Sequence, residues 1–239
     1  CGDKRGKKMT DIKENIRSVL DRVKNVSIKS GRNPDDIIVV AATKTVEAKR
    51  INEAVEAGIK YVAENRVQEF RDKTNDISPL AVQHFIGHLQ TNKVKYLVGN
   101  VDLIHSVDSE RLLDEIQRIA EKSGIIQKVL IEVNASGEES KFGVKSADVV
   151  KILENNENRK NVKVCGLMTI GPNYAKSDEI REVFRNLYKL YLDISQKKYH
   201  NSNMEFLSMG MSADFEIAIE EGANIVRVGS AIFGRRNYI

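Results

Sequence analysis

Short apolar runs and longer amphipathic stretches alternate along most of this chain. Eight runs of apolar or β-branched residues have the length of buried strands, and each is followed by a polar turn. They span residues 37–42, 61–63, 84–86, 103–105, 129–133, 164–170, 206–209 and 225–228. Apolar positions with the helical period lie between several of them, at 109–122, 147–154 and 180–196. Strands that alternate with helices predict right-handed βαβ units and a parallel sheet.

The first amphipathic segment, residues 10–30, precedes all of these strands. It begins with Thr10 as a predicted N-cap and places five apolar residues at helical spacing: Ile12, Ile16, Val19, Leu20 and Val23. Eight strand–helix units in a chain of 239 residues predict a single closed (β/α)8 barrel of the TIM type, with this helix added at its N-terminus. A doubly wound open sheet is the alternative.

The formal net charge of +4 comes mostly from one terminal segment. Residues 1–8 carry four cations and one acid, a net +3, which leaves +1 for residues 9–239. We therefore expect a disordered or vector-derived tail at 1–8 and one domain at 9–239. Nucleic-acid binding is disfavoured, because such proteins cluster Lys and Arg across the folded domain.

Apolar content and cysteine content exclude further classes. Hydrophobic residues make up 41% of the chain and charged residues 30%, as in ordinary globular proteins. No apolar run approaches the roughly 20 residues that cross a bilayer, and no signal peptide is visible, so we expect a cytoplasmic protein without membrane contact. Cys1 and Cys165 have neither disulfide nor metal-site spacing, and Cys165 is expected to be a small core residue.

Lys44 directly follows the first apolar run, 37–42. Working residues of a (β/α)8 barrel gather at the carboxyl ends of its strands, so this lysine is a candidate nucleophile as well as an ordinary turn residue. Partial burial at the barrel mouth would lower its pKa and favour the neutral amine that Schiff-base chemistry requires.

The last two apolar runs end in small and hydroxyl residues. The loops after strands seven and eight of such barrels often bind phosphate, because glycines allow close approach and helix N-terminal N–H groups meet the anion. Gly210, Ser212, Gly229 and Ser230 occupy these loops and predict a phosphate cup. Each serine taken alone is better explained as a helix N-cap, whereas the two serines together with the two glycines favour the phosphate cup.

Arg227 lies within the apolar sequence "NIVRVGS", where a charge is costly unless it faces a site or pairs with a core carboxylate. A lysine amine, a phosphate cup and a buried arginine match the aldehyde, phosphate and pyridine nitrogen of pyridoxal 5′-phosphate. No metal site is predicted, since His84 and His88 lack spaced partners and are better explained as structural residues. His105 shows no specific signal.

Seven motifs in order resemble the pyridoxal phosphate homeostasis protein family, also called proline synthase co-transcribed homologues. They are "ATKT" at 42–45, "ENRVQE" at 64–69, "HFIGHLQTNKVK" at 84–95, "NASGEESKFGV" at 134–144, "GLMTIGP" at 166–172, "SMGMSADFE" at 208–216 and "VRVGSAIFG" at 226–234. The resemblance extends from the first helix to Tyr238. One departure is Ala63, where the family often has glycine.

The resemblance implies a fold like the N-terminal barrel of bacterial alanine racemase, with pyridoxal 5′-phosphate held as an internal aldimine on a lysine. Carried over residue by residue, it implies that Lys44 is that lysine and that Arg227 faces the pyridine nitrogen. Asn65 would line the cofactor pocket and Met209, with Gly210, would shape the phosphate loop. The phosphate ligands would be Ser212, Gly229 and Ser230.

The family resemblance also implies a role in intracellular cofactor homeostasis and in amino-acid and keto-acid balance, with no catalytic residue assigned. The recipients would be apo pyridoxal phosphate enzymes, and a monomer is expected. An alternative is a small racemase-type enzyme, which is disfavoured because the chain ends at Ile239 without the racemase's second domain and has Lys141 where the racemase has an arginine. A third possibility is a barrel enzyme that acts on a phosphorylated metabolite without a cofactor.

Overall fold

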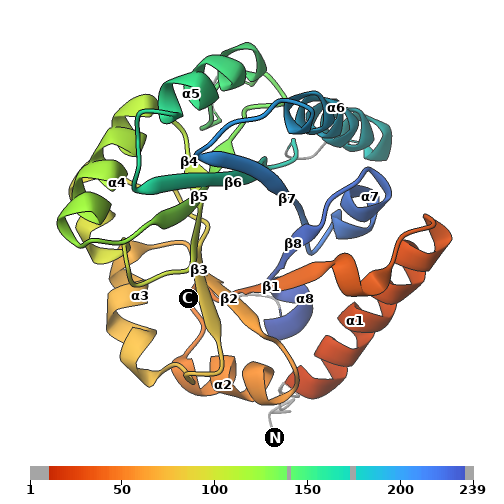
Figure 1. The fold of residues 1–239 in the computed structure, drawn as a ribbon. Coiled ribbons are helices and arrows are strands. Elements are labelled where there is room, and N and C mark those ends of the chain that lie inside the picture. The colour runs from red at the N-terminus through yellow and green to blue at the C-terminus, as the bar shows by residue number, and fades with distance from the viewer. Residues whose placement is uncertain (1–10, 139–140, 173–175, 235–239) are drawn as a thin grey trace, which may run out of the picture.

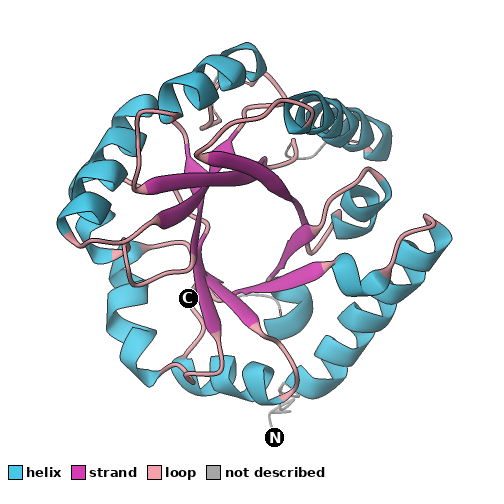
Figure 2. Cartoon of the chain, viewed as in Figure 1, coloured by secondary structure: helices cyan, strands magenta, loops and turns pink. Residues whose placement is uncertain are grey.

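The eight strands form a closed parallel barrel in which β8 pairs back with β1 (Figure 1). The computed structural model describes residues 11–138, 141–172 and 176–234, and the statements below refer to these residues. Helices surround the ring of strands (Figure 2). The predicted (β/α)8 barrel is confirmed, and the open-sheet alternative is wrong.

The elements follow one another in regular alternation. The strands are β1 Ile38–Ala42, β2 Tyr61–Glu64, β3 Val82–Phe85, β4 Leu103–Val107, β5 Gln127–Glu132, β6 Val162–Met168, β7 Ser202–Met211 and β8 Ile225–Val228. The helices are α1 Ile12–Lys29, α2 Ala48–Glu56, α3 Val67–Lys73, α4 Glu110–Lys122, α5 Val149–Asn156, α6 Ser177–Ser195, α7 Phe215–Glu220 and α8 Ser230–Phe233. Between β3 and β4 the chain forms a 3₁₀ helix, Thr91–Tyr96, instead of an α-helix.

Apolar side chains fill both sides of the strands, which explains why the strands read as continuous apolar runs. The larger core lies between the strands and the helices. A smaller cluster includes Val40, Ala63, Leu103, Leu130, Cys165 and Ile225. Cys165 is therefore a core residue, as expected, and burial raises the pKa of its thiol to about 11.

Helix α1 begins one residue later than predicted. Asp11 is its N-cap, and the Asp11 carboxylate accepts hydrogen bonds from the backbone of Lys13 and Glu14. Thr10, the predicted cap, lies outside the described residues. Leu20 has the helical spacing but lies outside the buried stripe, because it is 39% exposed. The buried stripe consists of Ile12, Ile16, Val19, Val23 and Val26.

Helix α1 completes the outer ring beside α2, α7 and α8 (Figure 1). Arg22 forms a bidentate pair with Glu216 of α7, with N–O distances of 2.7 and 3.1 Å. Asn15 donates to the carbonyl of Ile232 in α8 at 2.8 Å. Helix α8 has only 4 residues and is too short to cover the outer surface of the barrel next to it. The apolar stripe of α1 covers that part of the barrel instead.

Strand β7 is longer than its apolar run predicts. It begins at Ser202, which pairs with Val164 of β6, and it continues to Met211, which pairs with Arg227 of β8. Pairing with neighbours on both sides thus extends the strand through polar residues. The carboxyl ends of all eight strands lie at one end of the barrel, which we call the mouth.

Candidate functional site

Lys44 and Gly229 lie at the same edge of the mouth because β1 and β8 are neighbours. The register pairs Ala41 with Val228, so the residues that follow the two strands leave the barrel together. A Cβ atom on Gly229 would lie 3.2 Å from the carbonyl oxygen of Ala42, which is a tight contact. Lys44 itself is half-buried.

The predicted phosphate cup contains two backbone donors that point at one position. The N–H groups of Gly229 and Ala231 donate to the Ser212 Oγ atom at 3.1 and 3.3 Å. This hydroxyl oxygen therefore stands where an anion oxygen would accept the same two bonds. Ser212 does not cap α7, whose N-cap is Asp214. Ser230 is exposed at the start of α8.

Gly210 and Met209 have different relations to this cup. Gly210 has a φ of +90°, and a Cβ atom there would lie 2.5 Å from the Cβ of Ala218, so only glycine fits. Met209 is fully buried in the larger core. Its neighbour Ser208 faces the barrel interior, so the Met209 side chain points to the other side of the sheet. Only the backbone of Met209 can contribute to the loop.

Arg227 is buried inside the barrel at 3% exposure. Its guanidinium donates to the Ser208 hydroxyl at 2.7 Å and to the Thr169 carbonyl at 2.9 Å. Burial lowers the pKa of Arg227 to about 10, although Glu132 and Asp214 oppose this. The residue therefore stays a cation at neutral pH. No carboxylate of the described residues pairs with it within 4.0 Å, and three of its five N–H groups have no partner among them.

A chain of hydrogen bonds continues from Arg227 across the barrel. Ser208 Oγ lies 3.0 Å from His105 Nδ1, and His105 Nε2 lies 3.0 Å from His84 Nδ1. The Ser208 hydroxyl accepts from Arg227 and keeps its own proton and a second lone pair, so the donor and acceptor in both histidine contacts are set by the tautomers of His105 and His84. Burial lowers the pKa of His84 to about 4 and that of His105 well below its usual value. His84 is thus a buried neutral imidazole whose structural role stays a prediction, and His105 has a specific position that its sequence context did not reveal.

Strand β5 adds a carboxyl group to the mouth that sequence reasoning missed. Glu132 lines a cavity of about 160 Å³ together with Thr169, Lys141 and Phe142. Burial and the charge of Asp108 raise the pKa of Glu132 to about 7, although Arg227 opposes this. A charged residue within the apolar run "VLIEV" is the same signal that identified Arg227.

Two side chains near this cavity are held by neighbours. The His88 ring stacks on the Phe142 ring at 4.0 Å between centroids, and its Nδ1 atom lies 3.2 Å from the Asp108 carboxylate. Lys141 donates to the Gly171 carbonyl and pairs with Glu138, both at 2.9 Å.

Asn65 follows β2 and is half-buried at the mouth. A Cβ atom on Gly87, after β3, would lie 1.9 Å from the Asn65 carbonyl oxygen. The two strand ends therefore meet closely, and Gly87 permits this contact. Whether the Asn65 side chain lines a cofactor pocket stays a prediction.

Other functional classes find little support in the described part of the chain. Residues 11–138, 141–172 and 176–234 contain no group of three metal-ligating side chains. No helix among them is long and apolar enough to cross a membrane.

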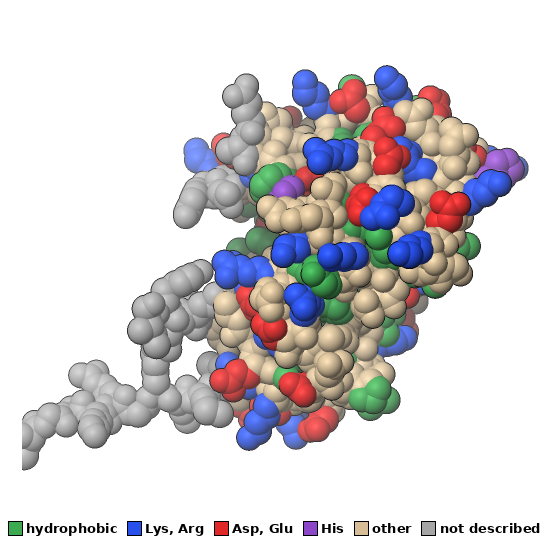
Figure 3. Space-filling model, turned by 90° about the vertical axis from the view of Figure 1, so that its left-hand side faces the viewer, with side chains coloured by type: hydrophobic (Ala, Val, Ile, Leu, Met, Phe, Trp, Pro, Cys, Tyr) green, Lys and Arg blue, Asp and Glu red, His purple; other side chains and the backbone are tan. Residues whose placement is uncertain are grey.

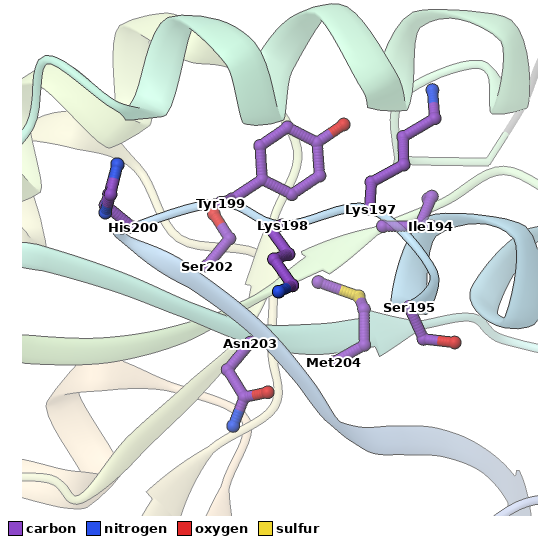
Figure 4. Close-up of a pocket in the computed structure, with 9 residues that line it drawn as sticks. All are labelled: Ile194, Ser195, Lys197, Lys198, Tyr199, His200, Ser202, Asn203 and Met204. Carbon is purple, nitrogen blue, oxygen red and sulfur yellow. The ribbon is translucent and has the colours of Figure 1, made fainter.

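On the face shown in Figure 3, cations and acids are interspersed. A groove of about 440 Å³ lies between the end of α6 and the start of β7, at the amino end of that strand and away from the mouth (Figure 4).

Comparison with known proteins shows which family this chain belongs to. The family model described as "Alanine racemase, N-terminal domain" matches residues 11–237. A protein of Aquifex aeolicus named pyridoxal phosphate homeostasis protein is 47% identical over 94% of this chain and 98% of its own length. Proteins of the same name from Escherichia coli and Homo sapiens are 35% and 36% identical, over 96% and 93% of this chain and 99% and 86% of theirs.

Solved structures agree with this assignment. PipY of Synechococcus elongatus, in a structure with pyridoxal phosphate bound, superposes with a TM-score of 0.81 at 30% identity, over 94% of this chain and 100% of that one. An alanine racemase of Clostridium difficile shares the fold, with a TM-score of 0.68 at 18% identity over 94% of this chain and 60% of the racemase. The chain therefore belongs to the pyridoxal phosphate homeostasis protein family, whose barrel is that of the alanine racemase N-terminal domain.

Proposed function

We propose that this protein binds pyridoxal 5′-phosphate at the barrel mouth and acts as a carrier in cofactor homeostasis. The observation that supports this most directly is the cup, in which the Gly229 and Ala231 N–H groups converge on one oxygen beside the end of β1. Lys44 follows that strand, and Arg227 lies in the neighbouring one. Relatives with the homeostasis name and the PipY structure with bound cofactor support the same ligand.

Each group of the mouth has a task that its chemistry suits. The cup would hold the phosphate through backbone N–H groups, which are fixed donors that need no counter-ion. Arg227 would direct an N–H group at the pyridine nitrogen. Lys44 would approach the aldehyde as the amine nucleophile. Pyridoxal 5′-phosphate supplies an electrophilic aldehyde and an aromatic ring that can withdraw electrons.

Arg227 favours a carrier over a catalyst. Its pKa of about 10 keeps the guanidinium protonated at neutral pH, so it donates a hydrogen bond to the ring nitrogen without transferring a proton. A pyridine ring that stays unprotonated withdraws electrons weakly. Catalysis at the substrate Cα is then poorly supported, although binding is not impaired.

One observation favours the racemase-type alternative. Glu132 has a pKa of about 7 and lines the cavity at the mouth, so it can exchange a proton near neutral pH as a general acid or base does.

To separate the carrier from the racemase-type alternative, cofactor-loaded protein is incubated with L-alanine in deuterated water, and the L and D products are separated by chiral analysis. We expect no useful rate of D-alanine formation. Rapid formation that is lost in Lys44→Ala and in Glu132→Gln would establish the alternative.

The proposed cofactor attachment is tested by borohydride reduction, which makes a lysine linkage permanent. Protein reconstituted with pyridoxal 5′-phosphate should absorb near the visible edge, and after reduction the label should lie on the peptide that contains Lys44. Lys60→Ala is the control, because this exposed lysine directly precedes β2 and so lies at the end of the barrel opposite the mouth. Labelling of another lysine, or of none, would contradict the proposal.

Three further properties stay predictions that accompany this function. We propose that apo pyridoxal phosphate enzymes receive the cofactor and that the carrier is a monomer in the cytoplasm. Transfer to an apo-enzyme faster than free cofactor binds would support the first. Light scattering and cell fractionation test the second and third.

A further inference from the structure

A largely buried ionic cluster lies beside the turn that bears Lys44, and no hydrogen bond or ion pair of the described residues joins its members to the Lys44 side chain. Lys73, in the last turn of α3, lies 3.0 Å from a carboxylate oxygen of Glu64 and 3.0 Å from one of Glu69. The exposed fractions of these side chains are 17%, 7% and 18%, respectively. The cluster therefore has much less access to water than a surface ion pair has.

The other side-chain hydrogen bonds of this cluster join it to Thr43 and Thr45, the residues immediately before and after Lys44 in the chain. On one side, the Thr43 hydroxyl donates to Glu64 at 2.6 Å, and Lys73 donates to the Thr43 carbonyl at 3.3 Å. On the other side, the Thr45 N–H donates to Glu69 at 2.7 Å. The turn is thus fixed immediately before and immediately after the lysine.

The backbone of this turn is strained. Thr45 has a φ of +63°, the one non-glycine residue with positive φ in the described chain. A β-branched residue is a genuine outlier in this region, and such conformations persist only where the surroundings impose them. The Val46 N–H donates to the Thr43 carbonyl at 2.9 Å and closes the turn, and the bond from the Thr45 N–H to Glu69 holds the Thr45 peptide from outside the turn.

The charges agree with this role. The hydrogen bonds from Thr45 and Lys73 hold the pKa of Glu69 below its usual value, although burial alone would raise it. Burial raises the pKa of Glu64 despite its bonds to Thr43 and Lys73. Burying such charges is costly, and apolar residues of similar size would often stabilise a fold as well. The cluster is therefore better explained by the geometry it imposes than by the stability it adds.

We propose that Glu64, Glu69 and Lys73 are positioning residues that hold the strained Thr43–Thr45 turn so that the Lys44 amine faces the mouth. The proposal rests on the proposed function, since it assigns Lys44 the task of reaching the cofactor aldehyde. If the contact of Glu69 with Thr45 is lost, the turn relaxes. The variant must then adopt the strained turn again when the cofactor binds. A cost of about 1.4 kcal/mol for this change weakens the affinity for the cofactor about tenfold.

The test compares two ligands that differ only at the aldehyde. Pyridoxal 5′-phosphate can react with Lys44, whereas pyridoxine 5′-phosphate, with an alcohol in that position, tests ring and phosphate binding alone. In Glu69→Ala, affinity for the aldehyde should fall about tenfold and affinity for the alcohol should stay the same. Gln68→Ala is the matched control, because Gln68 is exposed on the same helix and bonds only to Asp72. Equal losses for both ligands, or no loss, would overturn the proposal.

A double-mutant cycle adds a readout that a general structural role would not produce. Glycine adopts positive φ without strain, so the turn of Thr45→Gly should need the cluster less. In that background Glu69→Ala should weaken aldehyde binding by less than threefold. A tenfold loss in both backgrounds would contradict the strain argument. Lys73→Met is less suitable, since it leaves Glu64 buried without its cation and the variant is at risk of not folding.

Amide hydrogen exchange tests the cluster without any cofactor. The Thr45 N–H should exchange slowly in the wild type and at least tenfold faster in Glu69→Ala, while Gln68→Ala matches the wild type. Unchanged exchange would refute the positioning role even if cofactor binds. Faster exchange together with equal wild-type affinity for the aldehyde and the alcohol would instead refute the proposed linkage to Lys44 and leave the cluster's hold on the turn established.

Discussion

Replacing Glu132 by glutamine should stabilise the protein at alkaline pH and leave its stability near pH 4.5 almost unchanged. Glutamine keeps the shape of the side chain and removes its ionisation. Glu132 is 4% exposed, and burial together with the charge of Asp108 raises its pKa to about 7. At pH 8 the native wild type must therefore hold an ionised carboxylate in surroundings that favour the neutral acid.

The sign and the size of the effect follow from proton linkage. An unfolded chain titrates a glutamate at a pKa of roughly 4.3. Between that value and about 7 the native state retains a proton that the unfolded state has lost, so the contribution of Glu132 to stability falls as pH rises. At about 1.36 kcal/mol for each pKa unit, this difference corresponds to about 3 to 4 kcal/mol above pH 8.

Urea unfolding followed by circular dichroism from pH 4.5 to 8.5 measures this difference. The stability of Glu132→Gln relative to wild type should rise by about 3 kcal/mol across that range, which for a chain of this size corresponds to roughly 6–12 °C in melting temperature. Glu121→Gln is the control, since Glu121 is exposed on α4, and its difference from wild type should not depend on pH. A Glu132→Gln difference that is equal at both ends of the range would refute a raised carboxyl pKa.

Three further substitutions test the phosphate cup and the barrel interior. Ser230→Asp places a negative charge beside the phosphate and should weaken pyridoxal 5′-phosphate binding at least tenfold in an equilibrium titration; unchanged affinity would remove this residue from the site. Ser208→Ala removes the hydroxyl that accepts a hydrogen bond from the buried Arg227 guanidinium. It should lower the free energy of unfolding in urea by about 1–3 kcal/mol and also reduce cofactor affinity. Ser106 is another buried serine, and Ser106→Ala should lower stability without changing cofactor affinity. Gly210→Ala should cost about 2–5 kcal/mol because it adds a steric clash to an unfavourable φ, whereas Gly58→Ala, with positive φ but no atom within 4 Å of the added Cβ, should cost less in the same assay.

The sequence was most informative where a charge interrupts or ends an apolar run. Lys44 and Arg227 were proposed as site residues in this way, and the structure places Lys44 just after β1 and Arg227 in the neighbouring strand β8. Glu64 and Glu132 carry the same signal at the ends of β2 and β5, so this reasoning could have found them. The approximate strands were also predictable, because buried parallel strands are apolar on both faces.

Other features depend on contacts that no local pattern records. Lys73 and Glu69 look like an ordinary i,i+4 pair on a helix, and only the packing of α3 against the end of β1 brings them to the turn. The positive φ of Thr45 runs against its β-branched side chain, so local preference predicts the opposite. The inward direction of Ser208, and hence the outward direction of Met209, follows from strand pairing.

The residues proposed to bind the cofactor come from opposite ends of the chain, and this affects how the site forms. Lys44 follows the first strand, whereas Arg227 and Gly229 belong to the last strand and its loop, so their approach depends on the pairing of β1 with β8 that closes the barrel. An unfolded or partly folded chain cannot present the amine, the guanidinium and the cup together. A ligand that contacts all three therefore binds only the closed barrel and stabilises it by mass action, by about 2.7 kcal/mol at a hundredfold excess over its dissociation constant. Release of such a ligand would need no opening of the β1–β8 seam, because the mouth faces outward and only the proposed Lys44 linkage, the Arg227 hydrogen bond and the cup contacts would have to break. That combination, a rigid barrel with reversible contacts at one end, suits a protein that holds a reactive aldehyde and later gives it up.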